Sequence, residues 1–217
     1  MEKLFSAITF TILFILFGAY TSANASAPET FDDIKNIINQ EFDNYVEIYE
    51  LNESLNIETR SSYVSNETLK FDTKEELIEF IRELKENEPI IEKEESLITN
   101  NNSFRSNSIN EVAQYKITPT IKNLKQPFAL RVLVSYNYTP VGYITKFINS
   151  VGNVDSYSTV VAIADWTQRG STVNINAAKS HANISVYGTW EYNAEVGSGL
   201  FTIPIGFRVS DSYNLVL

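Results

Sequence analysis

The chain has 217 residues, a formal net charge of −10, 43% hydrophobic residues and no cysteine. These values exclude an intrinsically disordered chain and are typical of one substantial domain, or of a small domain beside a medium-sized one. The lack of cysteine excludes disulfide bonds and a cysteine-linked lipid anchor, so we expect core burial to hold the fold together.

Residues 1–25 are predicted to be a signal peptide. Lys3 precedes an apolar run from Leu4 to Tyr20, and Ala23-Asn24-Ala25 matches the small-residue pattern that signal peptidase recognises. We therefore expect cleavage before Ser26 and a secreted, extracellular protein. An uncleaved membrane anchor is the alternative, because about 17 to 20 apolar residues are just enough to cross a bilayer. We interpret the cysteine-free, Asn-, Ile- and Lys-rich composition as bacterial, of the Gram-positive type.

Residues 26–95 are predicted to form an acidic helical region, either an accessory domain or a pro-region. Residues 28–111 carry 21 acidic and 8 basic side chains, whereas residues 112–217 carry 5 and 8. Apolar residues at three- and four-residue steps predict a first helix, with a capping box formed by Thr30 and Asp33. These apolar positions are Phe31, Ile34, Ile38, Phe42, Tyr45 and Tyr49.

A short extended stretch is expected at 57–71, and a second helix follows it. Asp72-Thr73 is a helix-start signal, and Pro89 is expected to stop the helix. The apolar stripe of this helix comprises Leu77, Ile78, Ile81 and Leu84. Residues 96–111 are rich in Asn and Ser without periodicity, which predicts a linker open to proteolysis.

Residues 112–217 are predicted to form an antiparallel β-sandwich-like domain, so the expected class is α+β. Segments rich in Val, Ile, Tyr, Phe and Thr alternate with turn residues. The expected strands are 113–122, 128–138, 141–149, 157–166, 171–177, 182–196 and 200–216. The expected turns are at Gln126-Pro127, Thr139-Pro140, Gly152-Asn153 and Arg169-Gly170.

The last two strands are predicted to form a long terminal hairpin. Apolar residues take the even positions from Ala182 to Val196 and the odd positions from Phe201 to Val209, with Gly197-Ser198-Gly199 between them. The residue numbers of two facing partners must then add up to an odd number, which requires a loop with an even number of residues. A Ser198-Gly199 turn would place Trp190 opposite Phe207, and a Gly197-Ser198 turn would place it opposite Ile205. Pro204 indicates an edge strand or a missing donor that points outward.

This hairpin has two interpretations. It is either the core of a soluble sandwich or a membrane-inserting hairpin, since a membrane-spanning strand needs only about 9 to 11 residues with one apolar face. The membrane-facing residues would be Trp190, Tyr192, Phe201, Ile203, Ile205 and Phe207.

The sequence offers no catalytic motif, so we predict that the protein is not an enzyme and has no cofactor or metal site. His181 is the single histidine, which excludes a two-histidine metal site, and no serine lies in a nucleophile-elbow pattern. Glu191 and Glu195 would lie about 13 Å apart along one strand, too far for a glycosidase pair. The weakly basic second half does not predict nucleic-acid binding.

We therefore hypothesise a secreted, non-enzymatic β-domain protein that acts by binding at a cell envelope or to a protein partner. Trp166 and Tyr187 are the candidate contact residues, and the candidate partners are a cell-envelope glycan, a protein and a membrane surface. The alternative is the precursor of a membrane-active β domain, pore-forming or bacteriocin-like, which the acidic pro-segment holds inactive.

Overall fold

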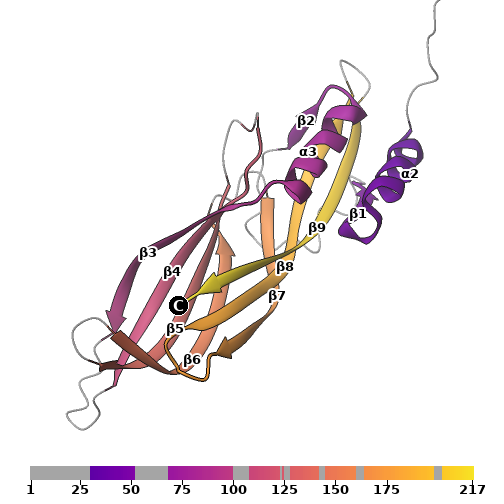
Figure 1. Cartoon of the computed structure of the whole chain (residues 1–217). Coiled ribbons are helices and arrows are strands. Elements are labelled where there is room, and N and C mark those ends of the chain that lie inside the picture. The colour runs from indigo at the N-terminus through magenta and orange to yellow at the C-terminus, as the bar shows by residue number, and fades with distance from the viewer. Residues whose placement is uncertain are drawn as a thin grey trace, which may run out of the picture.

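The computed structural model describes residues 30–51, 68–99, 108–122, 124, 128–141, 145–159, 164–197 and 202–217 (Figure 1). The predicted signal peptide, most of the predicted extended stretch and the centre of the predicted linker lie outside these residues. The elements are α2 (Phe31–Phe42), η1 (Asp43–Tyr45), β1 (Val46–Glu50), β2 (Leu69–Phe71), α3 (Lys74–Glu86), β3 (Ile90–Thr99), β4 (Ile109–Thr118), β5 (Leu130–Val141), β6 (Thr145–Ser158), β7 (Ala164–Ile175), β8 (Ala182–Val196) and β9 (Ile203–Val216).

Two packed sheets and two helices confirm the predicted α+β, sandwich-like class. The meander sheet has the order β3-β4-β5-β6, and every neighbouring pair in it is antiparallel. The hairpin sheet has the order β1-β9-β8-β2, with β7 also paired to β8. The Tyr115 hydroxyl of β4 donates to the backbone carbonyl of Val216 in β9 over 2.7 Å, which joins the two sheets.

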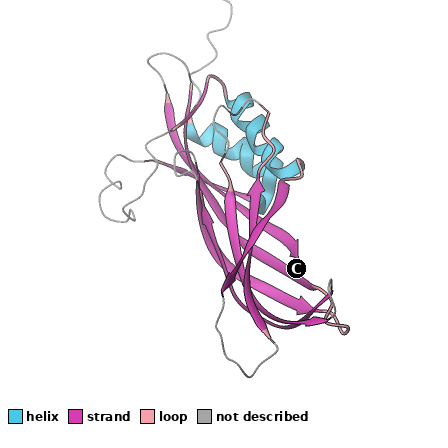
Figure 2. Ribbon diagram, turned by 90° about the vertical axis from the view of Figure 1, so that its left-hand side faces the viewer, coloured by secondary structure: helices cyan, strands magenta, loops and turns pink. Residues whose placement is uncertain are grey.

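Both helices lie at one end of the elongated molecule, over the hairpin sheet (Figures 1 and 2). Phe80 of α3 makes edge-to-face contacts with Tyr192 and Phe207, at 5.8 and 6.3 Å between ring centres. The helices thus cover the part of the hairpin beyond the meander sheet. Among the residues that the structure describes, no helix is long and apolar enough to span a membrane.

The helix starts follow the sequence signals. The amide of Asp33 donates to the Thr30 hydroxyl over 3.3 Å, and the Thr30 amide donates to the Asp33 carboxylate over 3.0 Å, which confirms the capping box. The first helix ends at Phe42, so its predicted extension to Tyr45 and Tyr49 is wrong. Tyr45 lies in η1, and Tyr49 lies in β1, which pairs with β9.

The first half of the chain forms part of the same core as the second half. β1 pairs with β9 from Val46↔Val209 to Glu50↔Ile205, and β2 pairs in parallel with the end of β8. Strands β3 and β4 also extend into the range expected to be a linker, at residues 96–99 and 109–111. Residues 90–93 are exposed on both faces of the edge strand β3, so their sequence lacks the alternation that signals a strand.

The hairpin has an even-numbered loop, as its pattern requires, but neither predicted register is right. Val196 faces Ile203 and Trp190 faces Val209, so the loop comprises the six residues 197–202. β9 is an inner strand between β1 and β8, not an edge. The Leu51 amide donates to the Pro204 carbonyl over 3.3 Å, which places the missing donor of Pro204 on the β1 side.

Three of the predicted turns are wrong, because these residues lie inside strands. Thr139 and Pro140 pair with Phe147 and Lys146 in the β5–β6 hairpin. Gly152-Asn153 lies within β6, and the register shifts between Gln168 and Gly170 inside β7. Glycine here marks bulges or close contacts in long strands, which a short-range pattern does not separate from turns. The fourth predicted turn, at 126–127, lies outside the described residues.

A hydrogen-bond chain crosses the core of the hairpin sheet beside an unpaired hydroxyl. The Trp190 indole N–H donates to the Tyr213 hydroxyl over 2.8 Å, and Tyr213 donates to the Asp211 carboxylate over 2.7 Å. Burial raises the pKa of Asp211 above its usual value, even though the hydrogen bonds from the Tyr213 hydroxyl and the Ser212 amide act to lower it. The Tyr192 hydroxyl is fully buried and has no hydrogen-bond partner among the described residues.

The two buried tyrosines are therefore expected to respond differently to loss of the hydroxyl. Tyr213→Phe removes the acceptor of Trp190 and should lower the free energy of unfolding by about 1–3 kcal/mol. Tyr192→Phe removes an unpaired polar group and should leave stability unchanged or raise it by about 1 kcal/mol. Urea unfolding of both variants measures the difference, and equal destabilisation would contradict the unpaired state of the Tyr192 hydroxyl.

Candidate functional site

The two predicted contact aromatics have opposite environments. Trp166 is only 8% exposed, packs 5.1 Å from Trp190 between ring centres, and donates its indole N–H to Ser156 over 2.8 Å. It joins β7 to β6 and is not available as a surface contact in this fold. Tyr187 is 42% exposed on the outer face of β8, where its ring lies across Gly170.

The apolar face of the hairpin belongs to the core in this structure. Trp190, Tyr192, Ile205 and Phe207 are at most 1% exposed, and Ile203 is partly buried. Phe128 packs on this face, with its ring centre 5.0 Å from that of Trp190 and 5.8 Å from that of Tyr192. Phe201 lies outside the described residues.

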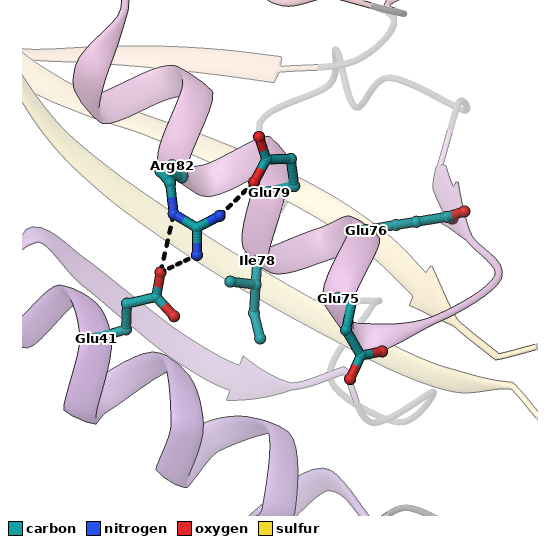
Figure 3. A pocket seen from close by; sticks show the side chains of 6 residues that line it. All are labelled: Glu41, Glu75, Glu76, Ile78, Glu79 and Arg82. Carbon is teal, nitrogen blue, oxygen red and sulfur yellow. Dashed lines mark hydrogen bonds and ion pairs between the residues drawn. The ribbon is translucent and has the colours of Figure 1, made fainter.

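An acidic groove of about 530 Å³ lies between the two helices (Figure 3). Ile78 is its apolar residue, and the remaining lining comprises Glu41, Glu75, Glu76, Glu79 and Arg82. Arg82 reaches across the groove, where it pairs with Glu41 of α2 and Glu79 of its own helix. These contacts clamp the two helices together, so the groove is explained by helix packing.

The residues considered for catalysis are dispersed. His181 is exposed in the turn before β8, and its Nδ1 lies 3.3 Å from the Ser180 hydroxyl. Glu191 accepts from the Tyr49 hydroxyl over 2.5 Å and pairs with Arg208 over 3.3 Å, so it helps to hold β1 on the outer face of the hairpin sheet. No group of three or more candidate metal ligands occurs within the described part of the chain.

A row of hydrogen-bonded amides crosses the outer face of the meander sheet. The side-chain amide of Asn137 donates to Asn110 over 2.8 Å, and that of Asn149 donates to Asn137 over 2.8 Å and to Thr139 over 3.0 Å. The ladder produces this row, because β4 and β5 place Asn110 directly opposite Asn137, and a bulge in β6 brings Asn149 beside them. The outer face therefore offers a prearranged line of donors and acceptors.

Two exposed apolar side chains lie next to this row. Phe147 pairs with Thr139 in the ladder and is 39% exposed, and Val141 is 52% exposed. Lys179 lies over the Phe147 ring, with its Nζ 5.3 Å from the ring centre. We call the surface formed by Asn110, Asn137, Thr139, Val141, Phe147 and Asn149 the amide face.

The inner face at the same end of the meander sheet holds a charged cluster. Glu111 is only 5% exposed, and its carboxylate accepts from the Lys146 ammonium over 2.6 Å. The same ammonium lies 3.2 Å from the Tyr136 hydroxyl and 4.4 Å from the centre of the Tyr138 ring. Burial is the largest single effect and would lower the pKa of Lys146, but the hydrogen bonds and charge interactions with Glu111 and Tyr136 together outweigh it and raise that pKa to about 12. Burial raises the pKa of Tyr136 to about 12.

The sequence predicts no site on either surface. The amide face depends on cross-strand register, which the sequence does not fix for the meander strands. The sequence does contain one sign that Glu111 is unusual. Along β4 the inner positions are Glu111, Ala113, Tyr115 and Ile117, so extending the strand back by one step places a charge in the apolar row. Comparison with protein-family models, curated proteins and solved structures finds no match to the chain.

Proposed function

We propose that the protein is a secreted, non-enzymatic protein that binds a cell-envelope glycan through the amide face. The observation that carries this proposal is the hydrogen-bonded amide row beside the exposed Phe147 ring. Sugar hydroxyls both donate and accept hydrogen bonds, and carboxamides offer both functions in one planar group. An exposed aromatic ring offers an apolar face on which the C–H face of a sugar ring can stack.

The shape and composition of the surface favour a glycan over a protein partner. The amide face lies on an exposed sheet, and its apolar contribution is limited to Phe147 and Val141. A stable protein interface buries about 800 Å² per partner and has an aromatic or aliphatic centre. The amide row is instead suited to a polar, extended ligand that it contacts along several residues.

The outer face of the hairpin sheet is the less favourable candidate. Its central charged residues pair with one another, since Arg208 contacts both Glu191 and Glu47 and lies over the Tyr49 ring. Ser185 donates to Asn214 over 2.6 Å on the same face. Tyr187 remains as an isolated exposed aromatic residue, which offers a contact but not a surface.

Co-sedimentation with insoluble cell-wall sacculi tests the proposal. Phe147→Ala and Asn137→Ala should each weaken binding about tenfold, the equivalent of about 1.4 kcal/mol, because each removes a contact that only this face provides. Tyr157→Ala is the matched control. Tyr157 lies on β6, the strand that carries Phe147, and is 46% exposed, but it pairs with Arg131 near the other end of β5. Unchanged binding in both amide-face variants, or an equal loss in Tyr157→Ala, would contradict the proposal.

The membrane-active precursor is the second hypothesis, and it requires the hairpin to leave the core. α3, β1 and β2, all from the first half of the chain, cover or flank the end of the hairpin that carries Tyr192, Ile205 and Phe207. Removal of that half would expose an apolar face of the kind that a bilayer accepts.

A further inference from the structure

The carboxylate of Glu111 is an exception in the core of the meander sheet. Among the described residues, the buried polar or charged side chains are Glu111 and Thr189, and only Glu111 carries a charge. A buried carboxylate is costly unless a cation and further hydrogen bonds compensate it. An apolar residue would complete the inner row of β4 without that cost, so the charge calls for an explanation beyond folding.

The groups around Glu111 match the requirements of an ammonium ion. The ammonium nitrogen of Lys146 lies 2.6 Å from a Glu111 carboxylate oxygen and 3.2 Å from the Tyr136 hydroxyl. The Tyr138 ring centre is 4.4 Å away, within the range of cation–π attraction, whereas the ammonium lies beyond the hydroxyl edge of the Tyr136 ring, 5.7 Å from its centre. An aromatic face, a hydroxyl and a carboxylate thus surround one cation, and these are groups that attract an ammonium ion.

Lys146 is the part of the Glu111 cluster that an external cation could replace. The side chain of Lys146 is 46% exposed, whereas Glu111 is 5% exposed and both tyrosines are buried. The carboxylate and the tyrosines are therefore fixed in the inner face of β4 and β5, and the ammonium reaches them from the solvent side on the neighbouring strand β6. An external ammonium group can compete for the same position without disturbing the core.

We propose that Glu111, Tyr136 and Tyr138 form a binding site for the ammonium group of an external ligand, and that Lys146 occupies this site in the free protein. The site lies on the inner face of the meander sheet and the amide face lies on the outer one, so neither binding activity depends on the other. Because Lys146 is part of the chain, its effective concentration at the site is in the millimolar range or above. It therefore competes with a free ammonium ligand and lowers the apparent affinity of the site for that ligand.

Titration of the full chain with choline chloride, followed by NMR of the tyrosine ring signals, tests the proposal. Wild type should show saturable shifts at Tyr136 and Tyr138, and Lys146→Ala should bind at least about tenfold more tightly because the tethered competitor is removed. Glu111→Gln should lose most of the binding. Lys179→Ala is the matched lysine control, because Lys179 lies over a single ring, that of Phe147, and its affinity for choline should equal that of wild type.

Two further arms make the outcome decisive. Sodium chloride at the same ionic strength should cause no saturable shift, and lysine amide in place of choline distinguishes primary from quaternary ammonium ligands. Saturable binding of either ammonium ligand to wild type supports the site. The absence of saturable shifts in wild type, even if Lys146→Ala binds, would show an internal ion pair only and would overturn the proposal. Because wild type carries this decision, poor folding of a variant does not obscure it.

Discussion

Ile205→Asp is expected to abolish the folded state. Ile205 is 0% exposed and lies opposite Ala194 at the centre of the covered part of the hairpin. Burying an unpaired carboxylate there costs more than about 5 kcal/mol, which is comparable to the whole stability of a typical domain. Circular dichroism and urea unfolding at neutral pH should therefore show no cooperative transition.

Ile203→Asp is the matched control for this substitution. Ile203 is the first residue of β9 and is only partly buried, so we expect a loss of about 1–2 kcal/mol and a folded protein. The membrane hypothesis makes a different prediction for Ile205→Asp. A variant that stays folded but no longer releases dye from lipid vesicles, under conditions in which wild type does, would show that this face serves a bilayer instead of the core.

Phe80→Ala is expected to lower the free energy of unfolding of the whole protein by about 3–5 kcal/mol. Phe80 is 7% exposed and contacts Phe71 at 5.5 Å between ring centres, in addition to its contacts with Tyr192 and Phe207. Its loss leaves a cavity between α3 and the hairpin sheet. Urea unfolding followed by tryptophan fluorescence measures the effect, since Trp166 and Trp190 both lie in the second half of the chain.

The neighbouring Glu79→Ala is the control for Phe80→Ala, because the Glu79 side chain is 56% exposed and pairs on the surface with Arg82. Such a substitution should change stability by less than about 0.5–1 kcal/mol. If Phe80→Ala changes only the helical signal and leaves the tryptophan transition in place, the first half unfolds as a separate unit. That result would favour the pro-segment hypothesis over a shared core.

Features set by neighbouring residues could be predicted from the sequence. The Thr30–Asp33 capping box, the second helix and the alternation along the hairpin all appear as expected. Each depends on contacts within one helix turn or on the two-residue period of a strand. The even number of residues in the hairpin loop also follows from this period, but the register of the two strands depends on where they stop pairing.

Features that depend on long-range pairing could not be predicted. β1 joins β9 across about 160 residues of sequence, so the local pattern predicts Tyr49 in a helix, although the helix of the structure ends at Phe42. The sequence pattern predicts turns at Gly152 and Gly170, although the strands continue through both glycines with bulges. The amide row and the Glu111 cluster each need the register of three strands at once, and no local pattern in the sequence specifies that register.

NMR of the asparagine side-chain amides detects directly whether the amide face binds glycan. Soluble cell-wall glycan fragments would be titrated into the labelled full chain. We predict saturable shifts at the side-chain amides of Asn110, Asn137 and Asn149 and at the Phe147 ring. Saturable shifts that map instead to the outer face of the hairpin sheet around Tyr187, or no shifts at all, would contradict glycan binding by the amide face.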